Sequence, residues 1–92
     1  MMNDAMMPET SCDDWYGGRL RLTQLVGGFR ANLDAILLAA AVPDHAQYVL
    51  ELGSGAGGAA LALAARVPDI SILAVEHDEV MAELLAQNIA QN

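Results

Sequence analysis

The sequence predicts an α/β fold in which two parallel strands are joined through a helix. The apolar run 48–52 is rich in aromatic, β-branched and aliphatic residues, which predicts a mostly buried strand. A glycine turn, 53–58, and an alanine- and leucine-rich stretch, 59–66, follow and predict a helix that ends before Pro68. The apolar segment 70–75 predicts a second buried strand. This order places backbone N–H groups at the carboxyl end of a parallel strand, where nucleotide-like ligands bind.

Two elements are expected before this unit. Residues 19–26 begin with alternating polar and apolar side chains, which predicts a half-exposed edge strand. Residues 33–42 predict a helix with Asn32 as its N-cap and Pro43 as its stop. Because this helix is apolar all round from Ala35 onward, we expect it to be buried or covered.

The segment after residue 78 predicts a final helix, because apolar residues recur there at helical spacing while Gln91 faces away. We therefore divide the chain into three parts. Residues 1–14 have a polar composition that predicts a disordered arm. Residues 15–47 hold the strand and helix that precede the glycine turn, and residues 48–92 form the first half of a ligand-binding domain.

Composition excludes several classes of function. The chain carries 12 acidic and 4 basic residues and a net charge of -8, so it offers no basic surface for nucleic acid. Its single cysteine, Cys12, and the absence of a CxxC or His/Cys ligand pattern predict a reduced setting without a metal site. No secretory signal or membrane-spanning run is present in the sequence. These features predict a cytoplasmic protein without a membrane partner.

Two carboxylates flank the glycine turn. Glu51 lies two residues before Gly53, on a strand where a dehydrogenase usually has an apolar residue. A buried charge there needs a cation or a set of donors to receive it. Glu76 closes the next strand 23 residues after Gly53, where a carboxylate can accept hydrogen bonds from both hydroxyls of an adenosine ribose.

The stretch Val-Leu-Glu-Leu-Gly-Ser-Gly-Ala-Gly at 49–57 resembles motif I of the class I S-adenosylmethionine-dependent methyltransferases. Together with Gln24, the segment 28–30 and the segment 34–39, it is similar to the amino-terminal region of the small-domain type. Within that type the chain is most similar to the bacterial tRNA(Val) adenine-37 N6-methyltransferases. The resemblance implies a partial Rossmann-like fold, with a leading strand and helix and then β-α-β-α, truncated before the remaining strands.

The resemblance implies S-adenosyl-L-methionine as the cofactor. Glu51 would hold the ammonium group of its methionine, Glu76 the ribose, and the glycine backbone would pass beneath the ligand. Arg30 and Asp34 would lie near the methionine end, with a surface charge and a helix-start charge as the alternatives. His77 would border the adenine or face solvent. The implied cofactor-binding residues are Glu51, Gly53, Ser54, Gly55, Gly57, Glu76, His77, Arg30 and Asp34.

The implied reaction is methylation of an amino nitrogen of a nucleic acid base, adenine N6 of tRNA. The Asn-Pro-Pro-Tyr signature of such enzymes is absent from the sequence, so no catalytic residue is assigned. We expect a fragment that is inactive alone, that binds tRNA only through a missing carboxyl-terminal part, and that could self-associate through an exposed sheet edge. Two alternatives stay open. One is an NAD(P)- or FAD-binding unit, from Gly53-x-Gly55-x-x-Gly58, and the other is a non-catalytic fragment that needs a partner subunit.

Overall fold

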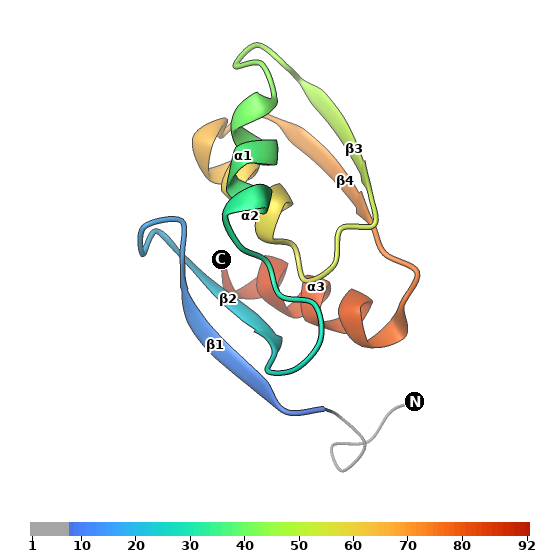
Figure 1. The fold of residues 1–92 in the computed structure, drawn as a ribbon. Helices are drawn as coiled ribbons and strands as arrows, with labels where there is room; N and C mark the ends of the chain where they lie inside the picture. Colours follow the sequence, from blue (N-terminus) through green and yellow to red (C-terminus); the bar gives the residue numbers. More distant parts are fainter. Residues whose placement is uncertain (1–7) are drawn as a thin grey trace.

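The computed structural model describes residues 8–92, so residues 1–7 of the expected arm lie outside the described residues. Strands and helices alternate along the chain after an initial pair of strands (Figure 1). The order is β1 (Thr10–Trp15), β2 (Leu20–Leu25), α1 (Leu33–Ala41), β3 (Tyr48–Leu52), α2 (Gly58–Arg66), β4 (Ser71–Val75) and α3 (Glu79–Gln91). The predicted α/β class is confirmed.

The described strands form two separate sheets of two strands each. β3 and β4 are parallel, with Tyr48 opposite Ser71 and Leu52 opposite Val75, and α2 connects them. The predicted parallel strand, helix and strand are therefore confirmed. The strand expected within residues 19–26 is confirmed as β2, which pairs in antiparallel fashion with β1 in a sheet separate from the parallel pair.

The predicted disorder of residues 1–14 is wrong for residues 10–14, which belong to β1. This strand has little apolar surface, and most of its side chains are exposed. Backbone pairing with β2 and two ion pairs hold it instead. Asp13 lies 3.2 Å from the guanidinium of Arg30, and Asp14 lies 3.0 Å from that of Arg21. Hydrophobic content does not predict such a strand, because the residues that hold it in place belong to the next strand and to the loop after that strand.

α1 and α2 cover one face of the parallel sheet (Figure 1). A buried cluster of Ala39, Ala62 and Leu63 packs there against side chains that include Val49 and Ile72. The other face is exposed in the described chain, so the prediction of mostly buried strands is wrong. Its large apolar side chains are Tyr48, Leu50, Leu52, Leu73 and Val75.

The expectation that the apolar helix 33–42 is covered on all sides is also wrong. In α1 only Ala39 is buried, and Leu33, Leu37 and Leu38 are more than half exposed. The described elements reach only the side of α1 that packs on α2 and the sheet. The N-cap prediction is confirmed, since Asn32 Oδ1 accepts a hydrogen bond from the backbone N–H of Asp34.

Asn88 of α3 and Asn92, the C-cap of that helix, bind the free edge of β2. Asn88 is fully buried; its Oδ1 accepts from Thr23 N at 2.8 Å, and its Nδ2 donates to Thr23 O at 2.9 Å. Its Nδ2 also donates to Ala56 O in the glycine turn, at 2.8 Å. One helical turn later, Asn92 pairs in the same way with the N–H and C=O of Arg21, at 2.9 and 2.8 Å. These amides occupy the place of a further strand and satisfy an edge that would otherwise stay open.

The sequence did not reveal this role for α3. Gln91, which was expected to face away, donates to Thr23 Oγ1 at 3.2 Å and to Asn88 Oδ1 at 2.7 Å. Asn88 therefore has both lone pairs of its oxygen and both N–H groups in use. This buried amide links the hairpin, α3 and the glycine turn.

Replacing Asn88 with Ala is expected to lower the free energy of unfolding by about 2–4 kcal/mol, because buried backbone groups of Thr23 and Ala56 lose their partner. Urea unfolding followed by circular dichroism measures the change. Gln87→Ala on the exposed side of the same helix is the control and should shift stability by less than about 0.5 kcal/mol. Equal effects of the two substitutions would contradict the role given to Asn88.

Candidate functional site

The glycine turn is fixed to the end of β4. The backbone N–H groups of Gly53 and Ser54 both donate to Val75 O, at 2.8 and 3.0 Å. Gly53, Gly55 and Gly57 have positive φ angles of 75°, 58° and 102°, a region that favours glycine. The turn therefore needs these glycines for its path and holds that path by backbone hydrogen bonds.

Gly57 and Gly58 permit close packing at the start of α2. A Cβ atom on Gly57 would lie 2.9 Å from the side chain of Leu85, and one on Gly58 would lie 2.8 Å from Ala31 Cβ. The indole N–H of Trp15 donates to Gly58 O at 2.9 Å. The glycines thus bring α3 and the β1–β2 hairpin against the turn, and Gly57 has a structural role outside the cavity described next.

A cavity of about 160 Å³ lies between the glycine turn, β2 and the start of α1. Its lining includes two acidic side chains, Asp34 and Glu51, and none of the described residues that line it is basic. Glu51 Oε1 is buried and has no hydrogen-bond partner within residues 8–92. A buried carboxylate oxygen without a partner is unfavourable unless a cation or an N–H donor binds it. The lining residues are Gln24, Phe29, Ala31, Asp34, Ala35, Leu38, Glu51, Gly53, Ser54, Gly55, Ala56, Gly58, Ala59 and Met81.

A second, more open hollow of about 510 Å³ adjoins the turn and contains Glu76. Phe29, Gly53, Gly55 and Met81 line both spaces, so the glycine turn lies between Glu51 and Glu76. The remaining residues that line this hollow are Pro8, Leu25, Asp78 and Val80.

Glu76 is held in its ionised form by backbone donors. Its Oε2 accepts from Asp78 N at 3.0 Å and its Oε1 from Gly55 N at 2.8 Å. The N–H groups of Asp78 and Gly55 hold the pKa of this carboxyl below its usual range. Each oxygen keeps a further lone pair, so Glu76 can still accept hydrogen bonds from hydroxyl groups of a ligand.

Most of the residues implied by the motif resemblance lie around these two spaces. Asp34, Glu51, Gly53, Ser54 and Gly55 line the cavity, and Glu76 lines the adjoining hollow.

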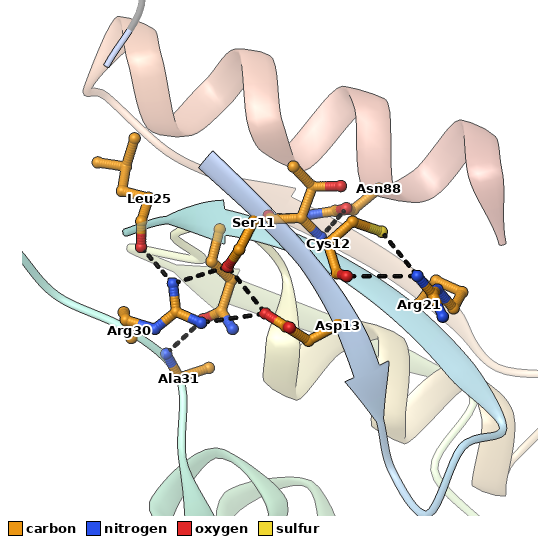
Figure 2. A network of polar contacts seen from close by, with 10 residues as sticks. Ser11, Cys12, Asp13, Arg21, Leu25, Arg30, Ala31 and Asn88 are labelled. Carbon is orange, nitrogen blue, oxygen red and sulfur yellow. Dashed lines mark hydrogen bonds and ion pairs between the residues drawn. The ribbon is translucent and has the colours of Figure 1, made fainter. Parts of the chain in front are cut away.

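Besides Gly57, two implied residues, Arg30 and His77, lie outside both spaces. The guanidinium of Arg30 donates to Ser11 Oγ and Leu25 O and pairs with Asp13, so it belongs to the hairpin (Figure 2). The side chain of His77 is 98% exposed, and its Nδ1 lies 3.6 Å from Glu76. His77 thus agrees with the solvent-facing alternative, whereas Arg30 is held by partners of the hairpin and is not a free surface charge.

Gln24 is the polar residue of the cavity that motif reasoning missed. It belongs to β2, is only 6% exposed, and its Oε1 accepts from Ala31 N at 2.7 Å. The sequence offered one indication of this role, because Gln24 belongs to the segment that carries the family resemblance. The strand pattern did not reveal this role, because the alternation covered only the first half of the segment 19–26, and the structure buries Thr23 and Gln24 in succession.

Other classes of site find no support in the described part of the chain. Residues 8–92 contain no group of three or more side chains that could hold a metal ion. Within the same range, every helix is too short or too polar to cross a membrane.

Comparison with known proteins gives two matches. A family model described as "Lysine methyltransferase" matches residues 31–92, which is more than half of the chain and includes the glycine turn and both carboxylates. A tRNA1(Val) (adenine(37)-N6)-methyltransferase of Flavobacteriaceae bacterium (strain 3519-10) is 40% identical over 65 residues. That alignment covers 70% of this chain and 28% of the relative, so the chain spans less than a third of the relative's length.

Stability should depend on pH through Glu76. Because the folded pKa is lowered, the stabilisation is complete above the unfolded value of about 4.3 and is lost as the pH falls through the folded value. Unfolding in urea at a series of pH values should therefore show that Glu76→Gln destabilises the protein most at pH 7. The gap between variant and wild type should shrink below about pH 4. A gap that is constant down to pH 3 would contradict this assignment.

Proposed function

Because this chain belongs to the class I S-adenosylmethionine-dependent methyltransferases, we propose that the two spaces beside the glycine turn bind the two ends of S-adenosyl-L-methionine. The matched family and the relative carry names that differ in the methyl acceptor and agree in the group transferred. The proposal therefore rests first on the donor site.

The unpartnered oxygen of Glu51 is the observation that carries the proposal. It lies in a cavity with Asp34, and the described lining contributes no positive charge. S-adenosyl-L-methionine has two positive groups, an ammonium and a sulfonium, which this acidic lining would attract. A pyrophosphate would bring negative charge to the same carboxylates, so the NAD(P) or FAD alternative is not favoured.

The sizes of the two spaces support a divided site. A cavity of about 160 Å³ is smaller than the roughly 300–1,000 Å³ of a pocket for a whole small molecule. It suits the methionine end, with its ammonium on Glu51. The adenosine would extend past Gly53 and Gly55 into the hollow that contains Glu76, whose carboxylate can accept hydrogen bonds from the ribose hydroxyls.

Bound S-adenosyl-L-methionine would supply a methyl group activated by the positive sulfur. The residues of this chain would bind and orient that donor, which lowers the barrier to transfer by positioning. Glu51 would fix the amino-acid end and Glu76 the ribose, while the glycine turn lets the ligand approach the backbone closely. No residue of the chain is assigned a chemical step.

Calorimetry with S-adenosylhomocysteine tests the donor site. Glu51→Gln should weaken binding about 10- to 100-fold, since a charge-assisted hydrogen bond is replaced by a neutral one. Glu83→Gln, on the exposed surface of α3, is the matched control and should bind as wild type does. Unchanged affinity in Glu51→Gln would overturn the proposal, and tighter binding of NAD than of S-adenosylhomocysteine would favour the dinucleotide alternative.

For the acceptor we propose an amino nitrogen of a nucleic acid base, adenine N6 in tRNA. The support is the name of the 40% identical relative, of which this chain covers 28%. The net charge of -8 gives residues 1–92 no basic surface for tRNA. The proposal therefore requires tRNA contacts outside this segment.

Deletion of the gene in its source organism tests the acceptor. Nucleoside analysis of purified tRNA(Val) should show loss of N6-methyladenosine, and reintroduction of the gene should restore it. Retained N6-methyladenosine together with a lost lysine methylation in the proteome would contradict a base acceptor and would agree with the description of the matched family.

A further inference from the structure

We propose that the ring of Phe29 stacks against the flat base that accepts the methyl group, an inference that rests on the proposed function. Phe29 belongs to the loop between β2 and α1 and lines both the cavity and the adjoining hollow. It is 70% exposed, the most of any large apolar residue that lines either space. Most of its ring is therefore free to contact a second molecule.

The position of Phe29 matches the place where the methyl group would be transferred. Four residues line both spaces, namely Phe29, Gly53, Gly55 and Met81. With the methionine end of the donor in the cavity and its adenosine in the hollow, the sulfur that joins them passes these residues. A Cβ atom on Gly55 would lie 3.5 Å from Met81 Cε, so Met81 packs against the glycine turn. Of the four, Phe29 alone comes from the β2–α1 loop.

The backbone that carries Phe29 is held to β2. The guanidinium of Arg30 donates to Leu25 O, at the end of that strand (Figure 2). The backbone N–H of Ala31 donates to Gln24 Oε1 at 2.7 Å. Because the two residues after Phe29 are both bonded to β2, the ring has a defined place although it is exposed. A ring fixed in this way can orient a flat partner for reaction.

Stacking suits a nucleic acid base better than the other acceptor that the comparisons name. Every base has a flat face that stacks on aromatic side chains, and its amino group lies at the edge, where stacking leaves it free. Enzymes that modify a base take it out of its own stack and support its face in this way. The side chain of lysine has no flat face, so Phe29 favours the base.

The single phenylalanine of the chain makes this contact directly observable. Protein with ¹³C-labelled phenylalanine gives NMR ring signals from Phe29 alone. After saturation with S-adenosylhomocysteine, so that the donor site is occupied, the protein is titrated with adenosine, an uncharged probe for the acceptor base. Adenosine should move the Phe29 ring signals upfield, through the ring current of the stacked base, and the shift should saturate. The amide of N-acetyl-lysine, titrated in the same way, should leave the signals in place.

Substitutions separate stacking from apolar contact, with binding followed through the backbone amide signal of Gly55. Phe29→Leu keeps an apolar side chain without a flat ring and should weaken adenosine binding at least about fivefold. Phe29→Tyr keeps the ring and should bind adenosine within about twofold of wild type. Leu37→Ala is the control, because Leu37 is similarly exposed on α1 and lies outside both spaces. It should bind adenosine as wild type does.

Three results would overturn the inference in a protein that binds S-adenosylhomocysteine. They are Phe29 signals that do not respond to adenosine, signals that respond equally to the lysine probe, and unchanged adenosine binding in Phe29→Leu. If wild type does not bind S-adenosylhomocysteine, the proposed function fails, and this inference fails with it.

Discussion

The hydrogen bonds from the glycine turn to the end of β4 are the constraint on which the site depends. Because the N–H groups of Gly53 and Ser54 share Val75 O, the turn stays at the carboxyl end of the parallel sheet. Glu76 follows directly and accepts the N–H of Gly55. The two carboxylates are thereby held beside one short backbone segment, where Glu51 lines the cavity and Glu76 lines the adjoining hollow.

The hairpin and α3 turn this local arrangement into a cavity. Asn88 joins the backbone of Thr23 to that of Ala56, and Trp15 reaches Gly58 O. Gln24, which follows Thr23 on β2, is thus held in the lining of the cavity. The apolar face of β3 and β4 has no cover in the described chain, so the cohesion of this part comes from one face of the sheet and from buried amides.

Features encoded by neighbouring residues could be predicted from the sequence, and features made by distant partners could not. The parallel unit and the cap at Asn32 follow from local patterns, and the structure confirms them. Glu51 and Glu76 were also singled out from local patterns, and they line the two spaces beside the glycine turn. The position of the Arg30 side chain depends on its ion pair with Asp13, and the burial of Asn88 depends on Thr23, 65 residues earlier in the sequence. Periodicity and composition do not predict such pairings, so the roles of β1, Gln24 and Asn88 were missed.

A crystal structure of the protein with S-adenosylhomocysteine tests the central claim most directly. The account predicts that the α-amino nitrogen lies about 2.7–3.0 Å from Glu51 Oε1, with the ribose hydroxyls on Glu76. A ligand bound with its amino-acid end away from Glu51, or one bound outside the glycine turn, would contradict it.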